Sequence, residues 1–224
     1  WPRDKICGDA VGGKSLSHVK ELGVKETLES TPHFRVTGIV FSSPKGYNVR
    51  VALPEEDVQR LEAGYSLPRQ QFDYLLFNQV QQLVRDAGGA VIQGGDVRDV
   101  LYNDGAGGED PGKGSGAQRH ASGIVVRIGG RNGEELTFHA PNVIGAAGYR
   151  CPVAKSMLEE TYEEPMMDRD HYCAGYREYW RGVKGCEDNV GDIEIHFVDT
   201  VIPGYFWLFP VAEGVVNVGI GMVM

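Results

Sequence analysis

The sequence predicts a mixed α+β fold built around a large, mostly antiparallel sheet. The last third of the chain is dominated by strand-like segments, and residues 192–198 alternate strictly, with Ile193 and Ile195 on one face. Such alternation is typical of strands that have one wet face. In contrast, residues 70–87 have the apolar spacing of a long helix. Helices and strands do not alternate regularly, so a parallel βαβ array is not indicated.

The N-terminal third is expected to contain a helix and a pair of strands. The helix covers residues 14–23, where apolar side chains recur at helical spacing and Gly23 can cap the end. The strands cover residues 33–41 and 47–53, and the intervening SSPKG supplies the turn. The second strand alternates apolar and polar residues, as a half-buried strand does.

The middle third is organised around the helix at residues 70–87, which Gly88 and Gly89 end. Its apolar stripe consists of Phe72, Leu75, Leu76, Val80, Leu83 and Val84. Short strands are expected at residues 90–93 and 97–102. A polar, glycine-rich loop follows at residues 104–122, and its composition is that of a surface excursion.

The remaining elements are mostly strands. A hairpin is expected from residues 123–128 and 134–138, because Asn132-Gly133 between them favours a tight turn. A short buried strand at residues 142–146 and a short helix at residues 153–158 follow. The last third then supplies strands at residues 171–179, 192–198, 205–209 and 215–223.

Composition excludes several classes of protein. The 224 residues are 42% hydrophobic and 24% charged, which is ordinary for a globular protein. A net charge of −9 without a Lys/Arg cluster argues against nucleic-acid binding. Four dispersed cysteines and scattered histidines predict no metal site and a reduced, cytoplasmic protein. The chain starts at Trp1 and stops in the apolar run 215–224, so we expect it to be incomplete at both ends.

One short motif suggests a nucleotide-binding alternative. Residues 8–15 read GDAVGGKS and fit the phosphate-loop pattern, in which backbone amides and Lys14 would surround phosphates and Ser15 would bind magnesium. That motif requires a buried strand before the loop. Residues 1–7 (WPRDKIC) are too polar for such a strand, so the pattern alone favours no P-loop fold.

Four segments resemble one family. Residues 203–210 read PGYFWLFP and are followed by the NVG of residues 217–219; residues 5–9 read KICGD; residues 68–75 read PRQQFDYL; residues 142–155 read NVIGAAGYRCPVAK. In this combination they resemble the geranylgeranyl reductase family of FAD-dependent oxidoreductases, which have the para-hydroxybenzoate hydroxylase fold. The chain departs from the pattern at Ala147, where an acidic residue is usual. The family's N-terminal G-x-G-x-x-G segment and its C-terminal G-D segment are not present in this sequence.

The resemblance implies a central fragment of a flavoprotein. Residues 1–32 and 67–158 would form parts of the FAD/NAD(P)-binding domain, and residues 33–66 and 159–224 the substrate-binding sheet. The implied activity is saturation of C=C bonds in geranylgeranyl or other isoprenoid chains. FAD would be the cofactor, with NAD(P)H or another reductant as the electron source. Without the G-x-G-x-x-G unit, this chain alone is expected to bind FAD weakly.

The resemblance also implies roles for individual residues. Cys7 is the candidate catalytic residue. Tyr205, Trp207 and Phe209 share one face of a strand and would line the substrate pocket. The candidate cofactor-binding residues are Lys5, Gly8, Asp9, Arg69, Gly145 and Gly148.

Three functions stay open at the level of sequence. The first is a prenyl-chain reductase, with an isoprenoid lipid as partner and peripheral membrane contact. The second is another flavoenzyme of the same fold, such as an aromatic hydroxylase or halogenase. The third is a non-catalytic fragment or a P-loop nucleotide-binding protein. No residue in the sequence identifies the general acid, and the oligomeric state is not indicated.

Overall fold

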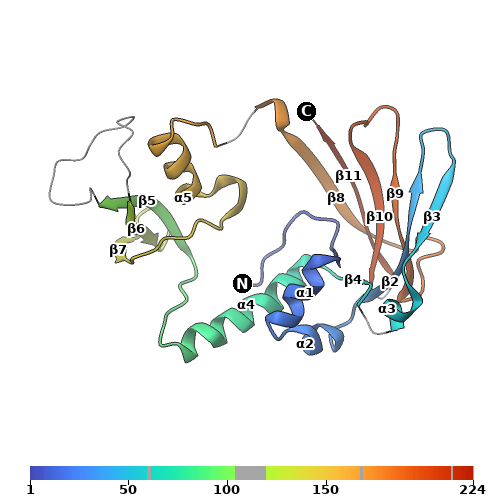
Figure 1. Cartoon of the computed structure of the whole chain (residues 1–224), viewed down its shortest axis with the longest axis horizontal. Coiled ribbons are helices and arrows are strands. Elements are labelled where there is room, and N and C mark those ends of the chain that lie inside the picture. Colours follow the sequence, from blue (N-terminus) through green and yellow to red (C-terminus); the bar gives the residue numbers. More distant parts are fainter. Residues whose placement is uncertain (60–61, 104–119, 167–168, 213, 224) are drawn as a thin grey trace. The chain divides into compact units, whose positions relative to one another are not determined.

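The computed structural model describes residues 1–59, 62–103, 120–166, 169–212 and 214–223 (Figure 1). The chain divides into two compact units. One comprises Trp1–Val91 and Cys173–Met224, and the other comprises Ile92–Tyr172. Both combine helices with antiparallel strands, so the predicted α+β fold is confirmed. None of the helices in the described part of the chain is long and apolar enough to span a bilayer.

The first unit contains a sheet of eight strands. Its central path runs β1 (Ala10–Gly12), β4 (Gly64–Ser66), β2 (Phe34–Ser42), β9 (Val190–His196), β10 (Tyr205–Ala212), β11 (Val215–Val223) and β8 (Cys173–Arg181), and β3 (Asn48–Ala52) pairs with β2. The pairs are antiparallel except for β2 with β9, which is parallel. The sheet therefore joins strands from the two ends of the sequence (Figure 1).

Four helices accompany this sheet: α1 (Lys14–Glu21), α2 (Lys25–Glu29), α3 (Glu55–Gln59) and α4 (Arg69–Asp86). A first core cluster joins α1, α2 and α4 to β1 and β4. Its buried members are Val11, Leu16, Val19, Val24, Leu28, Tyr65 and Leu67. A second cluster lies on the sheet and consists of Phe34, Val36, Ile193, Trp207 and Phe209.

The long helix is confirmed, but only part of its apolar stripe is covered. Phe72, Leu75 and Leu76 pack against the first core cluster. Val80 and Leu83, farther along the helix, are 46% and 50% exposed. The first two turns therefore provide most of the packing that holds α4 in this unit.

The second unit is a three-stranded sheet with short helical segments. Its strands are β5 (Gly95–Asn103), β6 (His120–Ile128) and β7 (Glu134–His139), in that order. A 3-10 turn (Gly148–Arg150) leads to α5 (Pro152–Lys155), which continues as a π-helical stretch (Ser156–Thr161). A further 3-10 turn (Arg169–His171) precedes β8. A hydrogen bond of 2.9 Å between Tyr102 Oη and Ser156 Oγ ties β5 to the helical stretch.

Two predicted strands are wrong. Residues 90–93 form no strand, and pairing begins only at Gly95. Residues 142–146 form no strand and are not buried, since Ile144 is 87% exposed. Both runs are apolar, but neither meets a partner strand among the described residues, and a strand requires that ladder. Most of the predicted loop at residues 104–122 lies outside the described residues.

Candidate functional site

One face of β10 carries an open pocket of about 230 Å³. Tyr205, Trp207 and Phe209 come from this strand, which places the three aromatic side chains on a common wall. The remaining lining residues come from the N-terminal segment and are Cys7, Gly8, Asp9 and Ala10. The structure thus brings the predicted catalytic cysteine and the predicted substrate-binding aromatic residues to one pocket.

Strand register explains the position of the wall. Trp207 is opposite Gly219 on β11, and a Cβ added to Gly219 would overlap the indole ring. The ring therefore occupies space that any side chain at position 219 would need. Trp207 is 7% exposed and Phe209 9%, whereas Tyr205 is 41% exposed at the outer end of the wall.

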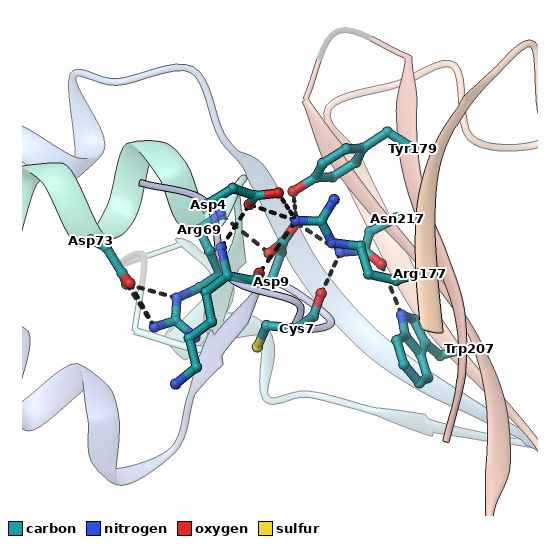
Figure 2. A network of polar contacts seen from close by, with 10 residues as sticks. Asp4, Cys7, Asp9, Arg69, Asp73, Arg177, Tyr179, Trp207 and Asn217 are labelled. Carbon is teal, nitrogen blue, oxygen red and sulfur yellow. Dashed lines mark hydrogen bonds and ion pairs between the residues drawn. The ribbon is translucent and has the colours of Figure 1, made fainter. Parts of the chain in front are cut away.

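The segment bearing Cys7 runs directly over the aromatic wall. A Cβ on Gly8 would lie 2.7 Å from the ring of Phe209, so only glycine permits this approach. Arg177 of β8 fixes the start of the segment through hydrogen bonds of 2.5 and 2.6 Å to the Asp4 carboxylate. It also donates to the backbone oxygen of Lys5, at 3.3 Å. Figure 2 shows this segment held between α4 and the sheet.

Asp9 is a fully buried carboxyl group at the end of this segment. Its Oδ2 accepts hydrogen bonds from Tyr179 Oη at 2.5 Å and from Asn217 Nδ2 at 2.7 Å. Its Oδ1 accepts from the backbone N–H of Arg69 at 3.2 Å. Burial raises the pKa of Asp9 above its ordinary value, although these three donors oppose the shift. Its backbone is also in the left-handed region, with φ of 69°.

Asn217 lies at the centre of the network and is fully buried. Its Oδ1 accepts a hydrogen bond of 2.9 Å from the indole Nε1 of Trp207. Its Nδ2 donates to the backbone oxygen of Cys7 at 2.6 Å and to Asp9. One amide therefore connects the pocket wall, the cysteine segment and the buried carboxyl group (Figure 2).

Arg69 begins α4 and anchors the helix next to the site. Its guanidinium donates to Asp73 at 2.7 and 3.0 Å, an ion pair across one helical turn. The sequence analysis predicted Arg69 as a cofactor contact; in the structure its guanidinium is paired with Asp73.

The predicted cofactor residues fall into two groups. Gly8, Asp9 and Arg69 meet at the pocket or beside it, and the side chain of Lys5 is exposed and does not line it. Gly145 and Gly148 belong to the other unit. There, a Cβ on Gly145 would lie 3.0 Å from Cys151 Sγ, and Gly148 has a φ of +80°. No group of His, Cys, Asp and Glu side chains within the described ranges is arranged to hold a metal ion.

The GDAVGGKS segment does not have the surroundings of a phosphate loop. Its only strand, β1, lies inside the motif and pairs antiparallel with β4. A phosphate loop instead follows a strand and leads into the helix. Asp9 of the motif is instead buried in the polar network, where it accepts hydrogen bonds from Arg69, Tyr179 and Asn217.

The sequence analysis missed Asn217, Tyr179 and Arg177. A polar residue inside the apolar run VVNVGIGMVM was the available signal for Asn217, because a buried amide needs partners. Nothing in the local sequence of β8 identified Tyr179 or Arg177. Their partners lie some 170 residues away, at Asp9 and Asp4.

Comparison with known proteins identifies relatives by sequence. No family model matches the chain. It is 29% identical over 228 residues to the digeranylgeranylglycerophospholipid reductase of Sulfolobus acidocaldarius, covering 99% of this chain and 43% of the relative. It is 24% identical over 223 residues to the menaquinone reductase of Mycolicibacterium smegmatis, covering 99% and 46%. The chain therefore spans somewhat under half the length of these relatives.

Solved structures agree on the fold. A geranylgeranyl bacteriochlorophyll reductase-like protein from Thermoplasma acidophilum superposes with a TM-score of 0.64 at 21% identity, covering 97% of this chain and 46% of that one. A myxobacterial chondrochloren halogenase, an FAD-dependent halogenase, gives a TM-score of 0.67 at 20% identity, covering 100% and 45%. The chain thus has the fold of FAD-dependent flavoenzymes, and its relatives include geranylgeranyl reductase-like proteins, as the sequence motifs indicated.

Proposed function

We propose that this chain is part of an FAD-dependent oxidoreductase that saturates C=C bonds of an isoprenoid chain. The observation that carries the proposal is the pocket between the aromatic wall and the Cys7 segment. Tyr205, Trp207 and Phe209 give it an apolar surface suited to a hydrocarbon chain. Cys7 adds a group that can exchange a proton.

The names of the relatives support the same chemical class. One is named for menaquinone, one for a digeranylgeranyl lipid and one structure for a geranylgeranyl pigment. All three molecules carry isoprenoid chains. An apolar pocket that opens to the surface suits a substrate class with a long chain and variable head groups.

The residues around the pocket fit a flavin as cofactor. Residues 7–10 border the pocket, and the ring of Phe209 fills the space that a side chain on Gly8 would need, which keeps this segment close to the aromatic wall. Cys7 and Gly8 would hold the ring end of FAD. When bound and reduced, FAD supplies the hydride. Asp9 is committed to three hydrogen bonds, so it would support the cofactor through the backbone of its segment.

The chemistry assigns a task to each side of the pocket. An isolated alkene has no carbonyl to accept charge, so a proton must reach one carbon while a hydride reaches the other. The aromatic rings exclude water and stabilise the developing positive charge. The thiol of Cys7 is the proton donor in this scheme, and solvent returns its proton after the alkene is reduced.

The test uses the complete protein with FAD reduced under anaerobic conditions. It is mixed with geranylgeranyl diphosphate or a polyprenylated quinone, and flavin reoxidation and product mass are followed. The proposal predicts oxidation of the flavin together with the gain of two hydrogens per reduced bond. Flavin that stays reduced with both substrates contradicts it. If the flavin is reoxidised only after air is admitted, and with halogenation of a product when halide is present, the chemistry is instead that of the fold neighbours that are halogenases.

A further inference from the structure

We propose that Asn217 is a positioning residue that sets the spacing between the Cys7 segment and the Trp207 wall. The inference rests on the proposed function, in which these two surfaces hold the substrate between them. It assigns to one buried amide the task of fixing both surfaces at once. It also explains why a polar residue stands in an otherwise apolar strand.

The amide of Asn217 uses both of its donors, and each of its ends has a partner. Its oxygen accepts from Trp207 Nε1 at 2.9 Å. Its nitrogen donates one hydrogen to the Cys7 oxygen at 2.6 Å and the other to Asp9 Oδ2 at 2.7 Å. A primary amide provides these two donors and this acceptor in one small group, so asparagine matches all three partners. These partners fix which way the amide points, because the reverse orientation would face an N–H toward the indole N–H.

Burial makes these contacts costly to lose. Asn217 and Asp9 are fully buried, and Trp207 is 7% exposed. A buried donor or acceptor left without a partner loses its hydration and gains nothing in return. Removal of the amide would therefore favour any rearrangement that lets the indole and the Cys7 carbonyl find other partners.

The surroundings leave little room for another arrangement. Asn217 is opposite Phe209 on β10 and Tyr179 on β8, so its side chain lies in a row across the sheet. Gly8 packs against the ring of Phe209. The charged and titratable groups around the amide come from three elements and are Asp4, Cys7, Asp9, Arg69, Arg177 and Tyr179.

The experiment uses two substitutions that differ in chemistry and not in size. Asn217→Leu removes all three hydrogen bonds. Asn217→Asp keeps the acceptor for Trp207 but places a second carboxyl group beside Asp9. Two carboxyl groups this close must share a proton, and the shared proton restores a donor toward Asp9. The single O–H cannot also reach the Cys7 carbonyl, so that hydrogen bond is lost at every pH. The surroundings of Trp207 in the aspartate variant should therefore resemble those of the native protein at acid pH and change as the pH rises, whereas the Cys7 segment should be less tightly held at every pH.

Two readouts report the spacing without any need for activity. Trp1→Phe and Trp180→Phe leave Trp207 as the only indole, so fluorescence and near-ultraviolet circular dichroism report its surroundings. Cys173→Ser and Cys186→Ser leave Cys7 and the buried Cys151, and alkylation of Cys7 by N-ethylmaleimide is then followed by peptide mass. Both readouts are recorded on the folded fraction at a series of pH values from acid to neutral, because coupled carboxyl groups release their protons in separate steps.

We expect Asn217→Leu to shift the Trp207 spectrum and raise the alkylation rate of Cys7 by about tenfold at every pH, as lost hydrogen bonding of this order allows. Asn217→Asp should show the native Trp207 spectrum at low pH and the altered one at high pH, and it should raise the alkylation rate of Cys7 at both. A spectrum and rate that stay native in both variants would overturn the proposal. So would a Trp207 spectrum of Asn217→Asp that is altered but does not depend on pH.

The outcome separates this inference from the proposed function. If Trp207 and Cys7 respond together but the complete enzyme reduces no prenyl substrate, the positioning role stands and the function fails. If the enzyme is active, Asn217→Asp should lower kcat more than it raises KM, with a smaller loss at acid pH than at neutral pH. An unchanged kcat in a variant with an altered Trp207 spectrum would contradict the positioning role.

Discussion

Trp207 packs its indole ring directly onto Gly219, its register partner on β11. The position of the ring depends on the glycine, because the ring fills the volume that a side chain at position 219 would need. Gly221, two residues along the same strand, is different: a Cβ there would lie 3.6 Å from the same ring, which is ordinary contact.

This contrast gives the first prediction. Gly219→Ala should destabilise the fold by about 1–3 kcal/mol, as overpacking of a buried position does, and should displace Trp207. Gly221→Ala is the matched control and should change stability little. Chemical denaturation measures both. Equal effects of the two substitutions would show that the indole does not depend on Gly219.

The second prediction concerns the size of the Trp207 contribution. Trp207→Ala removes a nearly buried ring and its hydrogen bond to Asn217, so it should cost about 3–5 kcal/mol. Trp180→Ala is the control, because Trp180 is 50% exposed on the edge strand β8. Its loss should cost less than about 1 kcal/mol. A Trp207→Ala protein as stable as the Trp180→Ala protein would contradict the described packing.

The third prediction follows from the raised pKa of Asp9. A carboxyl group whose folded pKa exceeds its ordinary value of 3.8 contributes stability that is complete below that value and is lost as pH rises through the folded pKa. Asp9→Asn removes this titration. The stability of the native protein relative to Asp9→Asn should therefore fall as pH rises from 4 toward neutrality, roughly the window of a raised carboxyl pKa. A difference in melting temperature between the two proteins that stays constant over this pH range would contradict the raised pKa of Asp9.

The fourth prediction concerns a carboxyl group whose contribution to stability changes with pH in the opposite direction. Asp192 on β9 accepts hydrogen bonds of 2.5 and 2.8 Å from Arg50 on β3, and these bonds lower the pKa of Asp192. Its contribution is present above the ordinary carboxyl pKa and is lost as pH falls through the lowered value. Asp192→Asn should thus lower the melting temperature by a few degrees at neutral pH, with a shrinking difference below about pH 4.

A matched control for this pair is the exposed ion pair between Arg98 and Asp96. The Asp96 side chain is 67% exposed, and exposed pairs contribute little. Asp96→Asn should leave the melting temperature nearly unchanged at every pH. A comparable drop in both variants would mean that the Asp192 contacts have no special role in joining β9 to β3.

The sequence predicted the elements whose signal is local. The helix expected at residues 70–87 is α4 (Arg69–Asp86), and the strand expected at residues 215–223 is β11 (Val215–Val223). The sequence pattern of α4 extends over 18 residues and that of β11 over 9, which is long enough to show which kind of element is present. Short elements such as β1 (Ala10–Gly12) and β4 (Gly64–Ser66) were missed, because three residues carry no period.

The site was predictable only where a residue type stands out in its own segment. The aromatic alternation at Tyr205, Trp207 and Phe209 revealed a shared face before the structure did. Asn217 and Tyr179 could not be placed, because their partners at Cys7 and Asp9 are brought near by strand pairing between distant parts of the chain. The prediction of a strand at residues 142–146 was wrong for a related reason. Apolar composition favours a strand, but a strand forms only where a partner strand provides the hydrogen bonds.

The most direct test of the central claim asks whether the pocket at Cys7 and Trp207 binds a prenyl chain. The Cys173→Ser, Cys186→Ser protein is treated with N-ethylmaleimide or with a maleimide that carries a geranylgeranyl tail. Cys7 alkylation is followed by peptide mass, with and without competing geranylgeraniol. The account predicts that the tailed reagent labels Cys7 at least about tenfold faster, the effect of roughly 1.4 kcal/mol of binding, and that geranylgeraniol or Trp207→Ala removes this advantage. Equal labelling rates for the two reagents, unaffected by the competitor, would contradict it.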